Sequence, residues 1–250
     1  MLIVIAIVVK RERDRSMIDI HSHLLPGVDD GCQSLEESLS LLQQAEQEGI
    51  EYVVITPHFM KNGAFKLSRD EIVKRFIEFK KVVKDKGLDI ELLLGNELYI
   101  HSSLDKLLLD KQVCSLNNTR YVLVEFPFEK YLDEYDEALY NIACSGYKVI
   151  IAHPERYAYV KDNINFVNRW IKEGYLLQCN QNSLFNANQK TVFRLIEKNY
   201  VSFIASDAHN EYRPCSLLKA YQKVKKQFGE ITANKLFEDN ALNMLQNREI

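Results

Sequence analysis

The sequence predicts an α/β fold in which parallel strands alternate with helices in one barrel-like domain. Seven short runs are rich in Val, Ile or Leu and almost continuously apolar, as parallel strands buried on both faces are. The segments between the runs are long enough to hold crossover helices. The predicted strands are Met17–His21, Tyr52–Thr56, Ile90–Glu97, Tyr121–Phe126, Lys148–His153, Tyr175–Cys179 and Val201–Ser206.

The predicted helices carry start and stop signals. Residues 34–37 (SLEE) and 68–71 (SRDE) fit the capping box, in which Ser and Glu satisfy each other's free backbone amides. Gly49 and Gly87 follow the expected ends of these two helices, where a left-handed residue is wanted. Further helices are predicted at Leu132–Ser145, Ile164–Lys172, Gln189–Lys198, Leu217–Phe228 and Thr232–Gln246.

Composition narrows the class of protein. With 250 residues, 46% hydrophobic and 27% charged, the chain is an ordinary globular protein. Its formal net charge of −3 gives no basic footprint for nucleic acid, so we expect no nucleic-acid partner. The five cysteines form no CxxC pair, which favours a reducing, cytoplasmic location over a disulfide framework.

Residues 1–16 stand apart from this pattern. The apolar run Leu2–Val9 precedes four basic residues, and it is shorter than the roughly 20 residues of a membrane span. Three interpretations compete: a start codon upstream of the natural one at Met17, a weak membrane-surface anchor, or an extra strand. We favour the first, and therefore expect an N-terminal extension over 1–16, a single domain over 17–250 and no stable membrane span.

Side chains of the metal-ligand type gather at the ends of the predicted strands. His21 and His23 lie two residues apart on the first strand, so both can point to one spot. The later strand ends add His58, Glu97, Glu125, His153, Gln178, Asn180, Asp207 and His209. In a closed parallel barrel, the carboxyl ends of the strands open onto one face, where such enzymes keep their active sites.

Five of the six histidines belong to this set, which makes a chance distribution a poor explanation. Asp30 joins from the loop after the first strand, because the turn expected at Asp29-Asp30-Gly31 is compatible with ligation. His101, the sixth histidine, is expected at the rim.

The predicted ligands combine imidazole with carboxylate and include no paired cysteine. This disfavours a closed structural zinc site and suits Mn²⁺, Fe or Zn in an open catalytic site. The predicted metal ligands are His21, His23, Asp30, His58, Glu97, Glu125, His153, Asp207 and His209. Nine ligands exceed the need of one ion, so we expect two or three ions sharing a bridging carboxylate, which can activate water and clamp phosphoryl oxygens.

Taken in order, these motifs resemble those of the polymerase-and-histidinol-phosphatase (PHP) superfamily. The closest resemblance is to the manganese-dependent tyrosine-protein phosphatases of bacterial capsule and exopolysaccharide biosynthesis, and it runs from Met17 to about Arg248. The motifs that carry it are residues 19–23 (DIHSH), 29–31 (DDG), 56–58 (TPH), 95–97 (GNE), 125–127 (EFP), 153–157 (HPERY) and 206–210 (SDAHN).

The resemblance implies a distorted (β/α)₇ TIM-like barrel with a trinuclear site at the carboxyl ends of the strands. It implies one ion held by His21, His23, Glu97 and Asp207. It implies a second held by Glu97, Glu125 and His153, and a third held by Asp30, His58 and His209.

Two arginines are implied as phosphate-binding residues. Arg156 matches the family arginine, and its planar fork suits a pair of phosphate oxygens. Arg213 is a second expected clamp, although only two residues separate it from Asn210, one fewer than in relatives.

The implied enzyme is a metal-dependent protein-tyrosine phosphatase. Water attacks phosphorus directly, without a phosphoenzyme, and His153 or Asp207 helps to deliver a proton to the leaving phenolate. The implied substrate is the tyrosine-rich tail of a bacterial autophosphorylating kinase that controls polysaccharide export. The alternatives are a small-molecule phosphatase of the histidinol-phosphatase type, an exonuclease, which the acidic charge disfavours, and a non-enzymatic metal-binding scaffold. The sequence makes no prediction about oligomeric state.

A cysteine-dependent phosphatase is a weaker hypothesis. Residues 114–120 (CSLNNTR) match a Cys-x₅-Arg loop. Such a loop should follow a strand and lead into a helix whose N-terminus holds the phosphate. Here the predicted strand comes after the segment, and the segment has no glycine to let the backbone close around an anion.

Overall fold

The computed structural model describes residues 16–61 and 63–250. All but the last residue of the predicted N-terminal extension lies outside these ranges, and the division of the chain at Met17 stays a prediction. Ser16, the first described residue, is buried and donates a hydrogen bond to Glu51 Oε2 at 2.9 Å. Across the described ranges, no helix combines the length and apolar character needed to cross a membrane.

All paired strands run parallel, in two sheets of order β1-β2-β4 and β3-β5-β6-β7-β8-β9. Their bounds are β1 Met17–Ser22, β2 Ile50–Ile55, β3 His58–Phe59, β4 Glu91–Leu94, β5 Glu97–Tyr99, β6 Tyr121–Glu125, β7 Lys148–Ala152, β8 Leu176–Asn180 and β9 Val201–Ala205.

The predicted strand Ile90–Glu97 is wrong as one element. It is two strands, β4 and β5, which lie in different sheets and are separated by Gly95 and Asn96. β2 breaks in the same way at Thr56-Pro57, beyond which the unpredicted β3 pairs with β5. The chain changes direction at each break, and His58 of β3 then pairs with Glu97 of β5.

The first and last strands, β1 and β9, meet at their carboxyl ends. Asp207 N donates to His21 O at 2.9 Å, and His23 N donates to Ala208 O at 2.8 Å. These bonds join the chain after β9 to the end of β1. The loops after β1 and β9 therefore lie side by side, although nearly two hundred residues separate them.

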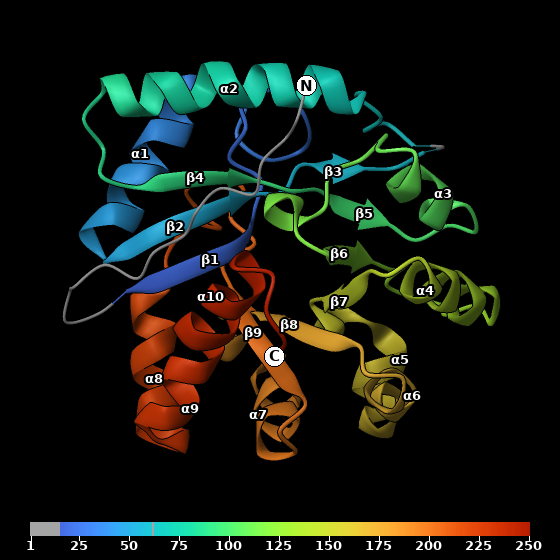
Figure 1. Cartoon of the computed structure of the whole chain (residues 1–250). Helices are drawn as coiled ribbons and strands as arrows, with labels where there is room; N and C mark the ends of the chain where they lie inside the picture. The colour runs from blue at the N-terminus through green and yellow to red at the C-terminus, as the bar shows by residue number, and fades with distance from the viewer. Residues whose placement is uncertain (1–15, 62) are drawn as a thin grey trace.

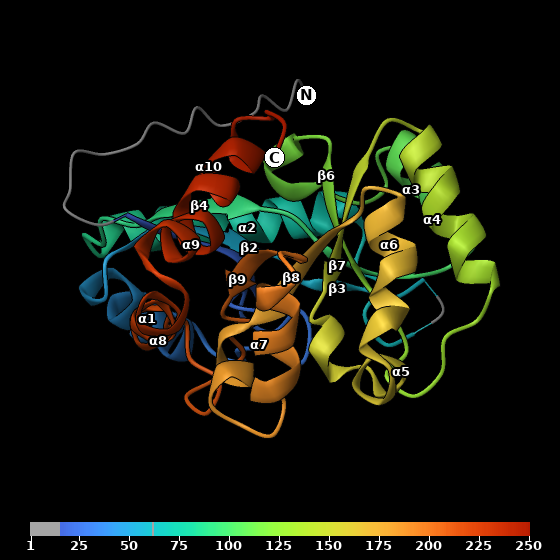
Figure 2. The ribbon, with the colours of Figure 1, turned by 90° about the horizontal axis from the view of Figure 1, so that it is seen from below.

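Helices surround the strands, with α2 above them and α7, α8 and α9 below in Figure 1, and Figure 2 shows the same arrangement from below. The α-helices are α1 Leu35–Gln47, α2 Arg69–Asp85, α3 Leu104–Leu109, α4 Glu134–Cys144, α5 Ala158–Asp162, α6 Asn168–Lys172, α7 Gln189–Glu197, α8 Leu218–Phe228, α9 Glu230–Asn234 and α10 Asn240–Leu245.

Most predicted helices agree with these bounds, and α3 and α5 were not predicted. Residues Ile164–Val167 form a 3₁₀ turn before α6, so the helix predicted from Ile164 starts late. The helix predicted over Thr232–Gln246 is interrupted by a π-helical segment at Lys235–Asp239.

The predicted capping box forms completely at α2 and only partly at α1. At α2, Ser68 and Glu71 satisfy each other's backbone amides, as the capping box requires. At α1, Ser34 accepts from Glu37 N, but the Glu37 carboxylate accepts from Gln33 N instead of from the cap residue. The predicted box at Ser34 is therefore only half formed.

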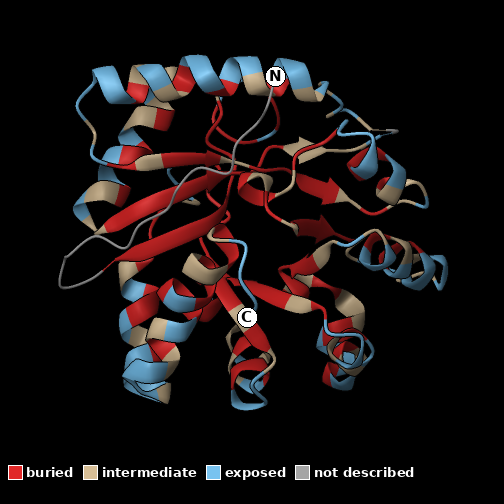
Figure 3. Cartoon of the chain, viewed as in Figure 1, coloured by how far each residue is buried: buried red, intermediate tan, exposed pale blue. Residues whose placement is uncertain are grey.

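The core has two parts, and Figure 3 shows the strands buried while the outer faces of the helices are exposed. The larger part packs the helices against the strands. The smaller one lies between the strands and includes Ile20, Val54, Leu123 and Phe203. Met244 of α10 belongs to this inner cluster, so the C-terminal helix plugs the end of the strands opposite to the histidines.

An aromatic cluster supports the ends of β6 and β7. The fully buried Trp170 lies at its centre, stacked on Phe126 with ring centroids 5.6 Å apart. Tyr157, which follows the turn after β7, accepts a hydrogen bond from Phe126 N at 3.0 Å. This bond fixes the chain after Glu125 against the chain after His153.

We expect Tyr157→Phe to lower the free energy of unfolding by about 1–3 kcal/mol, because the buried Phe126 N–H loses its acceptor. Denaturant unfolding measures this loss. Tyr140→Phe is the matched control, since Tyr140 is 60% exposed, and should change stability by no more than about 0.5 kcal/mol. Equal stability of the Tyr157→Phe variant and the wild type would show that the bond does not brace these strand ends.

Candidate metal centre

The structure brings the nine predicted ligands to one mouth at the carboxyl ends of the strands. Three sets of ligand atoms each lie within 4.8 Å of one another: His21, His23 and Asp207; His58, Glu97 and Glu125; and His23, Asp30, His58 and His209. These sets overlap the predicted grouping without matching it, because His23 and His58 each lie between two sets. The assignment of particular residues to particular ions stays a prediction.

His21 of β1 and His23, which directly follows β1, face each other with their Nε2 atoms 3.1 Å apart. Both side chains are fully buried, and because they lie two residues apart on extended chain, both point into the mouth. His21 Nδ1 lies 2.9 Å from Gln178 Oε1, and His23 Nδ1 lies 2.8 Å from Asp29 Oδ2. Since these oxygens are acceptors, each Nδ1 carries the hydrogen and each Nε2 directs a lone pair into the mouth.

Two lone pairs aimed at each other need a positive charge between them. The carboxylates of Glu97 and Asp207 add to this need, because they lie 3.2 Å and 3.4 Å from His21 Nε2. Burial alone would lower the pKa of His21, but the charges of these two carboxylates raise it. The donor set therefore fits a bound divalent cation, and without one it takes up protons.

The second part of the mouth is rich in carboxylates. His153 Nε2 lies 3.0 Å from Glu97 Oε1 and 3.5 Å from Glu125 Oε1. Burial raises the pKa of Glu125 to about 9, and the negative charges of Glu97 and Asp207 add to this effect. A cation shared by Glu97 and Glu125 would remove the repulsion between them.

The third part of the mouth opens to solvent. His58 Nε2 lies 3.5 Å and His209 Nε2 3.7 Å from Asp30 Oδ1, and the Asp30 side chain is 55% exposed. His58 Nδ1 lies 3.1 Å from Glu97 Oε2 but makes no hydrogen bond. Burial and the neighbouring His23 lower the pKa of His209 to about 3, so His209 presents a neutral imidazole suited to ligation.

Two predicted ligands sit on strained backbone. His153 has φ of 31° and Asp207 has φ of 53°, in the left-handed region that residues other than glycine avoid. Each follows the end of a strand, where this conformation turns the chain sharply and aims the side chain into the mouth. Strain of about 1–3 kcal/mol per residue is typical of functional sites.

A close backbone approach holds the loop that carries Asp30. A Cβ on Gly31 would lie 2.0 Å from His23 O, so only glycine fits there. Gly31 N donates to Asp29 Oδ1 at 3.0 Å, and Asp29 Oδ2 also accepts from His58 N at 3.0 Å. Against the effect of burial, the neighbouring His23 and these bonds lower the pKa of Asp29 to about 2.

Both predicted phosphate-binding arginines reach the mouth. Arg156 Nη1 lies 3.1 Å from Asp207 Oδ2, and its guanidinium lies 4.6 Å above the ring of Phe128. Arg213 Nη2 pairs with the same carboxylate oxygen, so the shortened spacing after Asn210 does not keep it away. About a third of each arginine side chain stays exposed, which leaves donors free for a ligand.

The mouth opens into a pocket of about 500 Å³. Its outer walls are aromatic: Phe65 stacks on His58 and Phe128 stacks on His153, with ring centroids 5.6 Å and 5.7 Å apart. Tyr99 completes this lining and also borders a smaller pocket that His101 lines. His101 thus lies at the rim, where the sequence placed it.

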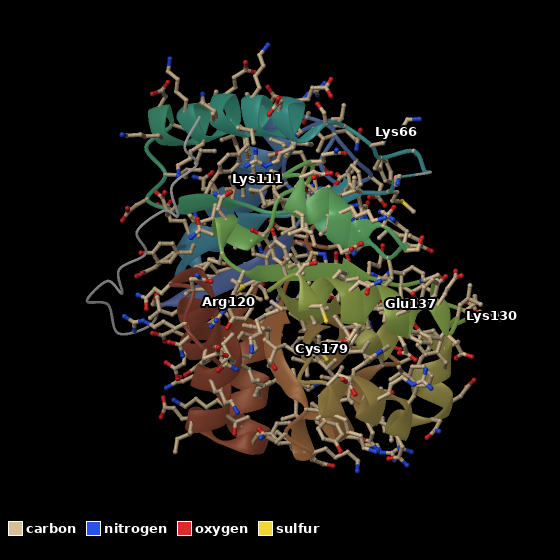
Figure 4. All side chains as sticks on the ribbon, turned by 45° about the vertical axis from the view of Figure 1, so that its right-hand side comes forward. Lys66, Lys111, Arg120, Lys130, Glu137 and Cys179 are labelled. Atoms are coloured by element: carbon tan, nitrogen blue, oxygen red, sulfur yellow. The ribbon has the colours of Figure 1, made fainter. Side chains whose placement is uncertain are left out.

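The Cys-x₅-Arg segment does not build a second site. Cys114 is buried, and burial raises the pKa of its thiol to about 11, far from a reactive thiolate. Arg120 pairs with Glu249 at 2.8 Å near the C-terminus. Figure 4 shows Arg120 on the side opposite to Lys66 and Lys130, which lie on the loops after β3 and β6.

Three side chains outside the nine predicted ligands contact those ligands. Asp29 was treated as a turn residue, yet it binds His23 Nδ1. Gln178 and Asn180 belong to the ligand-type side chains at the predicted strand ends but not to the nine predicted ligands, and both contact those ligands. Their alternate positions on β8, which place both side chains on one face of the strand, are the available signal.

Comparisons with known proteins show the family of the chain. Residues 17–246 match the family model described as capsular polysaccharide synthesis, CpsB/CapC. The chain is 36% identical over 244 residues to the tyrosine-protein phosphatase CpsB of Streptococcus agalactiae, covering 94% of this chain and all of that protein.

Solved structures give the same picture. One of them comes from work that describes YwqE of Bacillus subtilis and CpsB of Streptococcus pneumoniae as unique metal-dependent tyrosine phosphatases. It matches this chain with a TM-score of 0.88 and 30% sequence identity, over 94% of this chain and 96% of that one. The phosphotriesterase homology protein of Escherichia coli matches at 0.59 and 12% identity, over 92% and 98%, a likeness of fold alone. The predicted fold class is confirmed.

We expect Mn²⁺ to raise the melting temperature of chelator-treated protein by about 5–10 °C at a hundredfold excess over its dissociation constant. An equal concentration of Mg²⁺ should do much less, because imidazole suits Mn²⁺ better than a hard ion. Differential scanning fluorimetry measures both shifts.

His23→Ala should abolish the Mn²⁺-induced shift, whereas His101→Ala, at the rim, should keep it. A full shift in the His23→Ala variant would mean that the ions bind elsewhere.

Proposed function

The chain belongs to the CpsB/CapC family of capsular polysaccharide synthesis proteins, and from this we propose that it is a metal-dependent protein-tyrosine phosphatase. The observation that carries the proposal is the convergence of two arginines on the edge of a buried imidazole–carboxylate cluster. A cation-binding cluster beside two guanidinium groups is suited to a phosphate ester, whose oxygens carry negative charge.

The proposed cofactor is Mn²⁺, with two or three ions and with Fe or Zn as possible substitutes. The mixture of neutral imidazole and carboxylate donors supports this choice over Mg²⁺ or Ca²⁺. His21, His23, Glu97 and Asp207 would hold one ion. Glu97, Glu125 and His153 would hold a second, and Asp30, His58 and His209 a third. When bound, such ions lower the pKa of water and neutralise charge on phosphoryl oxygens.

The side chains of the pocket would orient the phosphate ester. Arg156 and Arg213 lie where they can bind the non-bridging oxygens, in place of their present partner Asp207. The Arg156 guanidinium lies 4.6 Å from the centre of the Phe128 ring, a cation–π contact that helps to hold it beside the mouth. Phe65, Tyr99 and Phe128 offer apolar walls for the phenol ring of a phosphotyrosine.

For the proton that the leaving phenolate needs, the proposed donor is His153 or Asp207, both of which border the mouth. Burial would raise the pKa of Asp207, but His21 and Arg213 lower it, which favours the ionised form. Burial lowers the pKa of His153, which favours the neutral imidazole. Both directions are consistent with ligation of a cation by these side chains.

For the physiological substrate, we favour the phosphorylated tyrosine-rich tail of a bacterial autokinase that controls capsule or exopolysaccharide production. The five free cysteines fit work in the reducing cytoplasm. The competing substrate is a small phosphomonoester of the histidinol phosphate type. Comparing kcat/KM on a phosphotyrosine peptide and on histidinol phosphate separates them, and a preference for the small ester would overturn our choice.

Hydrolysis of a phosphotyrosine peptide should stop on chelation and return with added Mn²⁺, because the lone pairs of the mouth then regain their cations. Cys114→Ser should leave the rate unchanged, since that thiol is buried away from the mouth. Full activity in excess chelator, combined with a dead Cys114→Ser variant, would reverse the assignment to cysteine chemistry.

Arg156→Gln should lower kcat by about 10²–10³, the usual effect of removing one donor to transition-state charge. Arg169→Gln is a matched control, because Arg169 also stacks on an aromatic ring, Phe166, at 4.5 Å and pairs with a carboxylate, Asp136, at 3.2 Å. Its kcat should stay within about twofold of the wild type. Similar losses in both variants would point to general destabilisation.

A further inference from the structure

β8 supplies no predicted metal ligand, yet its two inward side chains connect ligands on either side of the mouth. Gln178 and Asn180 lie two residues apart, so both face the interior. Gln178 is fully buried and Asn180 is 6% exposed. Buried amides in such a place must have their hydrogen bonds satisfied, which they are by one another and by the predicted ligands.

A continuous chain of hydrogen bonds runs from Asp207 to His21. Asn180 Nδ2 donates to Asp207 Oδ2 at 2.5 Å, and Gln178 Nε2 donates to Asn180 Oδ1 at 2.9 Å. His21 Nδ1 then lies 2.9 Å from Gln178 Oε1. Every member is buried, so water does not compete for these bonds.

The direction of this chain is fixed at its Asp207 end. The same carboxylate oxygen receives Arg156 and Arg213, so Asp207 is ionised and can only accept. Asn180 must therefore turn its NH₂ group to Asp207 and its oxygen to Gln178. Gln178 must in turn present its NH₂ group to Asn180 and its oxygen to His21.

The tautomer of His21, the last residue of this chain of hydrogen bonds, is then fixed. His21 must carry its hydrogen on Nδ1, which leaves the Nε2 lone pair aimed into the mouth. A direct contact between Asp207 and His21 Nε2, at 3.4 Å, is made by the other carboxylate oxygen. Asp207 thus faces the predicted ion with one oxygen and, through β8, sets the donor atom of His21 with the other.

We propose that Gln178 and Asn180 are positioning residues of the metal centre, which hold His21 in its Nδ1–H form and orient Asp207. This rests on the proposed metal-dependent function. Outer partners of metal-bound histidines act in this way by fixing the tautomer and the ring orientation. Asp29 does the same for His23 directly, whereas His21 is served by two neutral amides in series.

Asn180 also connects this chain of hydrogen bonds to the turn after β7. Asn180 N donates to Glu155 Oε1 at 2.8 Å, and Glu155 is fully buried. Glu155 directly precedes Arg156, so the backbone of Asn180 anchors the turn that carries the predicted phosphate-binding arginine. A change at position 180 that removes only the side chain leaves this anchor intact.

The test compares Gln178→Leu with Gln181→Leu, using the full chain. Gln181 is a matched control, because it is a buried glutamine on the same segment whose side chain bonds to Asn182. Titration with Mn²⁺, followed by the EPR signal of the free ion, gives the dissociation constant without any enzyme assay. Gln178→Leu should raise that constant about 10–100-fold, and Gln181→Leu should leave it within about twofold.

A second readout reports the tautomer itself. In protein loaded with diamagnetic Zn²⁺, one-bond ¹H–¹⁵N spectra should show a slowly exchanging His21 Nδ1–H in the wild type and in Gln181→Leu. In Gln178→Leu that proton should exchange at least tenfold faster. Asn180→Ala, a milder change that breaks the chain one step away, should move both readouts in the same direction.

Unchanged Mn²⁺ affinity in Gln178→Leu and Asn180→Ala, or an unchanged His21 Nδ1–H, would overturn the proposal. This result leaves the phosphatase assignment standing, since that assignment is tested by turnover of the wild type. Conversely, wild-type protein that binds Mn²⁺ but does not hydrolyse phosphotyrosine would contradict the function and not the positioning role. A wild type that binds no Mn²⁺ would contradict both.

Discussion

The crowding of acceptor atoms at the mouth of the strands is the constraint on which the rest of the structure depends. Lone pairs of His21 and His23 point at each other, and the carboxylates of Glu97 and Asp207 border the same space. No arrangement of these groups is favourable in a buried place without added positive charge. The negative charges of Glu97 and Asp207 raise the pKa of His21 against the effect of burial, and they add to the effect of burial in raising the pKa of Glu125.

Strained backbone and one close backbone contact hold these groups together. His153 and Asp207 adopt left-handed backbone, and Gly31 packs directly on the backbone of His23. Below the mouth, the apolar inner cluster and the aromatic cluster around Trp170 supply the burial that offsets such strain. The site is therefore held by the strands and their immediate neighbours, and it opens to solvent through the pocket that Asp30, Arg156 and Arg213 line.

Much of this arrangement could be predicted, because apolar runs and ligand-type residues repeat in step along the sequence. Prediction failed where the tertiary structure overrides local pattern. The run Ile90–Glu97 is continuously strand-like, yet Gly95 packs against Leu116, and the chain changes sheet there. Gln178 carries no charge and matches no ligand motif, so only its contact with His21 gives it a role. Which residues share an ion depends on sub-ångström placement that no spacing rule contains.

The central claim is that the imidazoles and carboxylates of this mouth bind cations together. Anomalous diffraction from crystals soaked in Mn²⁺ tests it most directly, because the signal locates the ions without reference to activity. We expect anomalous peaks between His21, His23, Glu97 and Asp207, with at least one more beside Glu125 or Asp30. A mouth without any peak, or peaks confined to surface carboxylates, would contradict the account.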